Sequence, residues 1–171
     1  SCFVQGSDLY RFTTLDIYLY WRERNAKLHA IHEVSPHNQD ANLTKISIND
    51  RCIFCPSSVS PEDLPWLYHE VFDPFKQNPS SYDHPGLHLG EKNWIIDAGA
   101  AEGFFSIFAA ERVRKGALVL GLEPLSIMHC PLKITLENYS DINFMLLPLA
   151  LSNQEGDALF NLSKDHICDS K

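Results

Sequence analysis

A short run of small and acidic residues most limits how this chain can fold. The run Asp97-Ala98-Gly99-Ala100-Ala101-Glu102-Gly103 begins at the end of an apolar segment, residues 93–98, and is followed by residues 104–115, which begin with a second apolar stretch. Gly99 can take the positive φ that side chains disfavour, so the chain can turn sharply after a strand. Small residues at 100 and 101 let a ligand approach the backbone, and the first N–H groups of a following helix suit a carboxylate or a phosphate. The run therefore predicts a strand, a ligand-binding turn and a helix.

The residues after this turn repeat the alternation of strand and helix. The expected elements are a buried strand at 93–98, a helix at 104–115 with a basic last turn, a strand at 117–123, a helix at 131–139 with Pro131 in its first turn, a strand at 142–151, a tight turn at 153–156 and a strand at 157–162. Apolar strands alternating with helices predict a parallel sheet covered on both faces. The expected fold class is therefore α/β, a Rossmann-like parallel sheet with flanking helices.

The first part of the chain predicts a mixed region instead. The expected elements are an amphipathic helix at 14–34, a polar boundary at 35–42, a hairpin at 46–54 turning at Asn49-Asp50, a helix from Ser60-Pro61 to about residue 72, and a loop at 78–89. We expect residues 1–90 to form a helical and hairpin cap region. Residues 91–171 are then the first half of a Rossmann-like domain, because a strand–crossover–strand unit takes roughly 30 residues or more and only three parallel strands fit there.

Two acidic residues stand at the predicted strand ends beside the turn. Asp97 precedes Gly99 by two residues, and Glu123 ends the next strand. A dinucleotide site would need G-x-G-x-x-G, whereas the spacing here is G-x-x-x-G, with Ala101 in the middle. Glu123 could hold a ribose in either ligand class, but Asp97 would repel a pyrophosphate and attract an ammonium and a sulfonium. This charge favours S-adenosylmethionine; the alternative is that Asp97 ties down the turn and Glu123 is solvated.

The same residues resemble a known family, the FkbM-type S-adenosylmethionine-dependent methyltransferases. The resemblance spans about residues 46 to 163, and its matching positions are Asp97, Gly99, Ala100, Gly103, Phe104 and Ser106, then Glu123 and Pro124, then Ala150, Leu151 and Gly156. It implies methyl transfer to an oxygen of a small-molecule or sugar-like acceptor. The cofactor residues would be Asp97, the Gly99–Gly103 turn with Ala100, Ala101 and Glu102, Glu123 and Pro124 at the ribose, and Leu125, Ala150 and Leu151 near adenine.

The chain departs from this family in three places. Ala101 stands where the family has Asn, Pro131 is not expected in its helix, and the chain reaches Lys171 before the family's later Lys-x-Asp-x-Glu-Gly block. No catalytic base can be named, and we expect weak or absent turnover from these 171 residues. Two alternatives stay open: an incomplete or non-catalytic nucleoside-binding module, and an NAD(P)-binding Rossmann domain.

Composition excludes several other classes of protein. The net charge is −8 and neither half of the chain is basic, so we expect no nucleic-acid partner. No apolar run approaches the about 18 residues of a membrane span, and the first residues do not read as a signal peptide. Five cysteines, an odd number, favour a reducing compartment, so the expected location is cytoplasmic.

Cysteine and histidine residues offer further candidate sites. Cys52 and Cys55 form a lone C-x-x-C after a predicted hairpin, which favours two buried thiols over a metal or redox site, so no metal is expected. His84 and His88 flank a Pro-Gly pair ahead of the first strand. We interpret them as loop residues facing water, with a base on the acceptor side as the alternative.

Overall fold

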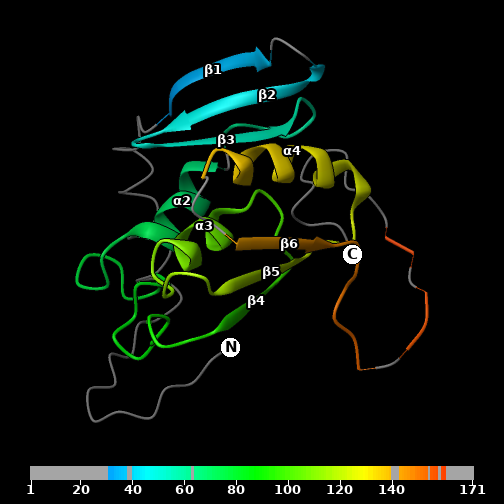
Figure 1. Cartoon of the computed structure of the whole chain (residues 1–171). Coiled ribbons are helices and arrows are strands. Elements are labelled where there is room, and N and C mark those ends of the chain that lie inside the picture. Colours follow the sequence, from blue (N-terminus) through cyan, green and yellow to red (C-terminus); the bar gives the residue numbers. More distant parts are fainter. Residues whose placement is uncertain are drawn as a thin grey trace, which may run out of the picture.

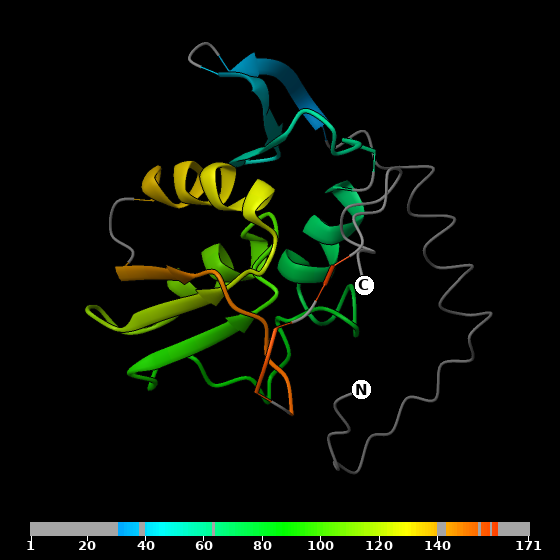
Figure 2. The ribbon, with the colours of Figure 1, turned by 90° about the vertical axis from the view of Figure 1, so that its right-hand side faces the viewer.

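The computed structural model describes residues 31–37, 40–62, 64–139, 143–153, 155–157 and 159–160. They form a mixed α/β structure with two separate three-stranded sheets, one antiparallel and one parallel. Helix α4 (Ser126–Glu137) lies between the two sheets in both views (Figures 1 and 2). No helix within the described ranges combines the length and apolar character that a membrane crossing requires.

The antiparallel sheet contains β1 (Ile31–His37), β2 (Asp40–Ile48) and β3 (Arg51–Pro56). The hairpin predicted at 46–54 is confirmed, since Ile48 pairs with Arg51 across the turn at Asn49, whose φ is 53°. The helix predicted at 14–34 is wrong at its end, because residues 31–34 belong to β1; its other residues lie outside the described ranges. The polar boundary predicted at 35–42 is also wrong at residues 35–37 and 40–42, which belong to β1 and β2, because antiparallel strands tolerate polar runs; residues 38 and 39 lie outside the described ranges.

Helix α2 (Leu64–Phe72) follows this sheet. It begins later than the predicted Ser60-Pro61 start and has Pro65 in its first turn, where a missing N–H costs nothing. Residues 73–93 carry no helix or strand beyond an isolated bridge between Pro74 and Asp83, which confirms the predicted loop. The loop leads directly into the parallel sheet.

The parallel sheet has the order β4-β5-β6, and its elements agree with the predicted alternation. They are β4 (Trp94–Ala98), α3 (Phe104–Ala110), β5 (Leu118–Leu122), α4 and β6 (Asn143–Leu147). Asp97 pairs with Gly121, so β4 and β5 end at the same edge of the sheet. This register brings the glycine turn next to the chain that follows β5.

Four predicted elements of this part need correction. The strand predicted at 142–151 ends at Leu147, and residues 148–151 are irregular. Helix α3 ends at Ala110, so the basic residues expected in its last turn follow the helix. Helix α4 starts at Ser126, which places Pro131 inside the helix instead of in its first turn. Pro131 removes one backbone hydrogen bond there, but its ring is almost fully buried, and that burial offsets part of the loss. The strand predicted at 157–162 is wrong for the described residues 157, 159 and 160, which are irregular.

The parallel sheet is covered on one face only within the described residues. Ile95, Val119 and Phe144 belong to or pack on the buried core on the helix side. Their neighbours on the opposite face include Trp94, which is 63% exposed, and Met145, which is 50% exposed. The prediction that helices cover both faces is therefore wrong for this part of the chain, and β4 is not the buried strand that was expected.

Contacts between helices and β3 fasten the two sheets together. The Arg51 guanidinium binds the Glu111 carboxylate through both oxygens at 2.9 and 2.8 Å and lies 4.0 Å from the centre of the Phe72 ring. On α4, the Thr135 hydroxyl accepts a hydrogen bond of 2.8 Å from the Phe54 backbone N–H. One cluster of buried side chains runs from β2 and β3 through α2 and α3 to α4. This cluster holds the glycine turn in a fixed place.

Candidate functional site

The glycine turn between β4 and α3 has three residues with positive φ. These are Gly99 at 80°, Ala101 at 43° and Gly103 at 87°. The backbone N–H groups of Gly99 and Ala100 both donate to the Leu122 carbonyl, at 2.8 and 3.1 Å, so the turn is tied to the end of β5. The sharp turn predicted at Gly99 is confirmed.

The two glycines serve different purposes. A Cβ atom on Gly99 would meet no atom within 4 Å, so this position faces open space. A Cβ atom on Gly103 would lie 2.6 Å from Cδ1 of Leu132. Gly103 therefore allows α3 to pack closely on α4, whereas Gly99 leaves the surface above the turn free.

A cavity of about 370 Å³ lies over this turn. Its walls come from α2, the loop after α2, the end of β4, the turn and the start of α3. The lining residues are Leu67, Glu70, Val71, Tyr82, Ile96, Asp97, Ala98, Gly99, Ala100, Ala101, Glu102, Phe104 and Phe105. The lining carries three carboxylates and, among these described residues, no lysine, arginine or histidine. The cavity thus favours a cationic group over an anionic one.

Asp97 is a buried carboxylate at the edge of this cavity. Its side chain is 6% exposed, and the Ser106 hydroxyl donates a hydrogen bond of 2.6 Å to it. Burial raises the pKa of Asp97 above its usual value; the Ser106 hydrogen bonds oppose that rise, and the negative charge of Glu123 adds to it. Asp97 pairs with Gly121, two residues before Glu123, so both acids lie at the same edge of the sheet, as the sequence predicted.

Glu123 is also buried, but its carboxylate holds the backbone. One oxygen accepts from the Ala101 N–H at 2.9 Å and the other from the Leu125 N–H at 2.8 Å. The Glu123 carbonyl contacts the His129 ring nitrogen at 2.7 Å. Glu123 therefore stabilises the turn, and it does not line the cavity. Its role at a ribose stays a prediction that relies on the remaining lone pairs of its oxygens.

Five of the predicted cofactor residues line the cavity and the others lie elsewhere. Asp97, Gly99, Ala100, Ala101 and Glu102 line it. The residues that do not are Gly103, Glu123, Pro124, Leu125, Ala150 and Leu151. Leu151 is 67% exposed, so in this structure the predicted adenine contacts are not gathered over the turn.

Sequence reasoning missed the wall that α2 contributes. Leu67, Glu70 and Val71 stand at helical spacing and face the cavity together. The sequence predicted a helix here but did not indicate that one of its faces lines a site. A single carboxylate on an otherwise apolar helix face was the available signal.

The predicted histidine and cysteine sites lie away from this cavity. The His84 ring nitrogen accepts a hydrogen bond of 2.9 Å from the Gly86 N–H, and the ring packs on Phe75 at 4.7 Å, so His84 shapes its own loop. His88 is exposed. Cys52 is half-buried and Cys55 fully buried on β3, and both are free thiols. No group of three or more metal-ligating side chains occurs in the described part of the chain.

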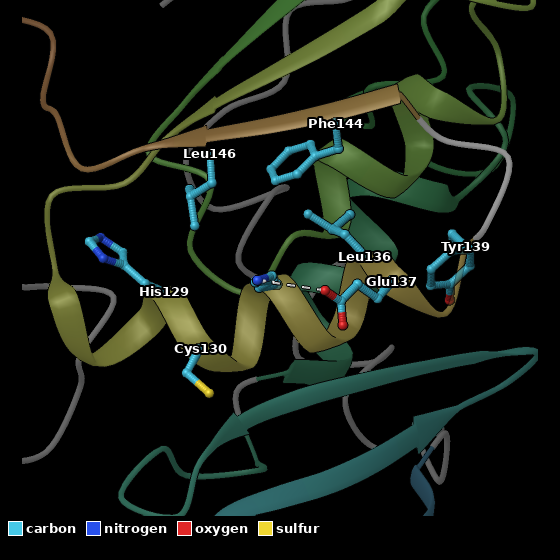
Figure 3. Close-up of a pocket in the computed structure, with 8 residues that line it drawn as sticks. His129, Cys130, Leu136, Glu137, Tyr139, Phe144 and Leu146 are labelled. Atoms are coloured by element: carbon cyan, nitrogen blue, oxygen red, sulfur yellow. Dashed lines mark ion pairs between the residues drawn. The ribbon is translucent and has the colours of Figure 1, made fainter.

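A second, larger hollow of about 800 Å³ opens between α4 and β6 (Figure 3). Figure 3 shows Phe144 and Leu146 of β6 on one side and His129, Cys130, Leu136, Glu137 and Tyr139 on the other. Lys133 and Glu137, which also line this hollow, form an ion pair at 3.8 Å, and both side chains are mostly exposed. The mostly apolar walls and this exposed pair give it no defined ligand chemistry, so the smaller cavity is the better candidate site.

Ala101 offers a test of the turn geometry. Because a side chain is disfavoured at φ 43°, we expect Ala101→Gly to raise the free energy of unfolding by about 1 kcal/mol. Glycine keeps the N–H that Glu123 accepts, so the turn keeps its shape. Urea denaturation of the variant and the wild type measures the change. A loss of stability would mean that the Ala101 methyl group packs more than its half-exposed position indicates.

Comparisons of the chain with protein-family models, with curated proteins and with solved structures gave no match. The functional assignment therefore depends on the chemistry of the cavity and the glycine turn.

Proposed function

We propose that this chain binds S-adenosylmethionine over the glycine turn and belongs to an enzyme that transfers its methyl group to an oxygen of a small-molecule or sugar-like acceptor. The observation that carries the proposal is a cavity whose charged lining residues are all carboxylates, set above a turn whose first glycine faces open space. S-adenosylmethionine brings a sulfonium and an ammonium into such a site. It is also the ligand that the resemblance to FkbM-type enzymes implies.

The charge of the cavity disfavours the NAD(P) alternative. A unit charge about 5 Å from one carboxylate, at an effective dielectric constant of about 20, interacts with it by about 3 kcal/mol. The sign is favourable for a sulfonium and unfavourable for a pyrophosphate. The short Gly99–Gly103 spacing, filled by Ala101 in a left-handed conformation, also differs from the dinucleotide fingerprint.

In this function the bound cofactor would supply an electrophilic methyl group, and the protein would supply position and charge. The glycine turn would receive the amino-acid end, because Gly99 projects no side chain into the cavity. The Ser106 hydroxyl donates a hydrogen bond of 2.6 Å to the Asp97 carboxylate and restricts its movement. Asp97 would then present a fixed negative charge to the cationic groups of the cofactor. Tyr82 of the loop and Phe105 of α3, whose rings lie 4.9 Å apart, line the cavity.

A second candidate function is binding of the nucleoside without methyl transfer. The involvement of both Glu123 oxygens in backbone hydrogen bonds favours it, because a ribose would then have to share them. Methyl transfer from labelled cofactor to a set of sugar and small-molecule acceptors separates the two functions.

The cofactor class is tested by calorimetry with S-adenosylhomocysteine and NAD. We expect S-adenosylhomocysteine to bind at least about tenfold more tightly than NAD, since one favourable charge contact is worth about that factor. Gly99→Ala should weaken this binding, because its methyl group enters the cavity. Gly116→Ala is the matched control: Gly116 has a similar φ of 83° and an equally open Cβ position, but it lies outside the cavity. Tighter binding of NAD, or equal effects of both substitutions, would refute the proposal.

A further inference from the structure

The α2 wall of the cavity carries a carboxylate with a distinct position. Glu70 lines the cavity together with Leu67 and Val71, on an element other than the glycine turn. Its backbone carbonyl accepts a hydrogen bond of 3.0 Å from the Tyr82 N–H, which fixes the cavity loop to this point of α2. Glu70 is therefore held at the cavity by both its helix and the neighbouring loop.

Glu70 differs from the other acids of the site in its contacts. Asp97 is bonded to Ser106, and Glu123 accepts two backbone N–H groups. The Glu70 carboxylate has no hydrogen bond or ion pair with any of the described residues. Burial raises the pKa of Glu70, and no neighbouring donor or cation counteracts it. A half-buried carboxylate without a partner attracts a cation that enters the cavity.

S-adenosylmethionine carries two cationic groups, a sulfonium and an ammonium, and their chemistry decides which of them Glu70 would bind. The sulfonium of S-adenosylmethionine has no N–H or O–H to donate, so its attraction to a carboxylate is purely electrostatic. The ammonium of the amino-acid end has three N–H donors and can form a charge-assisted hydrogen bond. An acid that lacks any donor fits the ammonium better than the sulfonium.

We propose that Glu70 binds the ammonium group of the ligand held over the glycine turn, which makes α2 the recognition element for the amino-acid end of the cofactor. This inference rests on the proposed function. It assigns Glu70 a role in binding, distinct from that of a base for the acceptor.

The test compares S-adenosylhomocysteine with its deaminated analogue, which keeps the nucleoside and the carboxylate but lacks the ammonium. Calorimetry is done on the wild-type chain, on Glu70→Gln and on Glu91→Gln. Glu91 is exposed and lies outside the cavity, so the control removes the same charge from elsewhere. We expect Glu70→Gln to weaken S-adenosylhomocysteine binding by about tenfold. It should leave binding of the deaminated analogue unchanged, and Glu91→Gln should change neither.

Each other outcome has one meaning. If Glu70→Gln weakens both ligands equally, or neither, the ammonium role is wrong while the proposed function stands. If the wild-type chain binds no S-adenosylhomocysteine, the proposed function fails and the inference fails with it. Thermal unfolding checks the fold of the variant; we expect no decrease in Tm, because burial disfavours the charge that Gln removes.

Discussion

Replacing Gly103 by alanine is expected to lower the free energy of unfolding by about 3 kcal/mol. Its φ of 87° is disfavoured for any side chain by about 1–2 kcal/mol. The new Cβ would also lie 2.6 Å from Cδ1 of Leu132, and overpacking of a core contact costs about 1–3 kcal/mol. Leu132 is fully buried on α4 and has little room to move. Urea denaturation at neutral pH measures the loss.

Two other glycines provide the controls for this experiment. Gly99 and Gly116 have φ values of 80° and 83°, and a Cβ on either would meet no atom within 4 Å. Alanine at these positions should therefore cost only the backbone contribution, about 1–2 kcal/mol. Equal losses in all three variants would show that the contact between α3 and α4 is looser than the structure indicates.

The three variants distinguish a glycine needed for helix packing from a glycine that leaves space for a ligand. Gly103 serves the packing of α3 on α4, and Gly99 serves the cavity. The sequence pattern alone treats both as parts of one glycine-rich motif. A motif match therefore overstates how many of its residues touch a ligand.

Local patterns predicted the elements of the parallel sheet because their signals are strong and short-range. The apolar run that ends at Asp97 and the small residues after it allow only a strand followed by a turn. The position of Glu123 beside Asp97 followed from the rule that parallel strands end at one edge. The hairpin at Asn49 was equally predictable from its alternating residues.

Features set by tertiary contacts could not be predicted in this way. Pro131 stands inside α4, where the burial of its ring offsets part of the cost of the missing hydrogen bond, and no local signal reports that burial. The open face of the parallel sheet was missed because Trp94 and Met145 belong to apolar runs that normally indicate burial on both sides. Glu70 was missed because α2 meets the glycine turn only in the folded chain.

The second large effect is expected at Asp97, where stability and binding should change in opposite directions. Asp97→Asn keeps an oxygen that accepts the Ser106 hydrogen bond but removes a charge that burial disfavours. We expect the variant to be at least as stable as the wild type at pH 7.5. Its affinity for S-adenosylmethionine should fall by at least about tenfold, because the carboxylate facing the cation is lost.

The pH dependence has a definite sign. The pKa of Asp97 is raised in the folded state, chiefly by burial and also by Glu123, against the Ser106 hydrogen bonds. An acid with a raised pKa in the folded state stabilises the fold at pH values below its unfolded-state pKa, which is about 3.9 for Asp. This contribution of Asp97 is lost as the pH rises through the folded-state pKa. Asparagine does not titrate, so the stability of Asp97→Asn relative to wild type should increase between pH 4.5 and 7.5. Urea denaturation of both proteins at the two pH values isolates this difference from the titration of other groups.

Ser106→Ala changes the environment of the same carboxylate, because it removes the hydroxyl that donates a hydrogen bond to Asp97. Removing the hydroxyl takes away the hydrogen bond that favours the charged form of Asp97, so the pKa of Asp97 should rise further and the protein should lose stability at pH 7.5. If Asp97→Asn instead destabilises the chain at pH 7.5 as much as Ser106→Ala does, then the carboxylate is a structural part of the turn. Unchanged affinity for S-adenosylmethionine in that same variant would then remove Asp97 from the binding site.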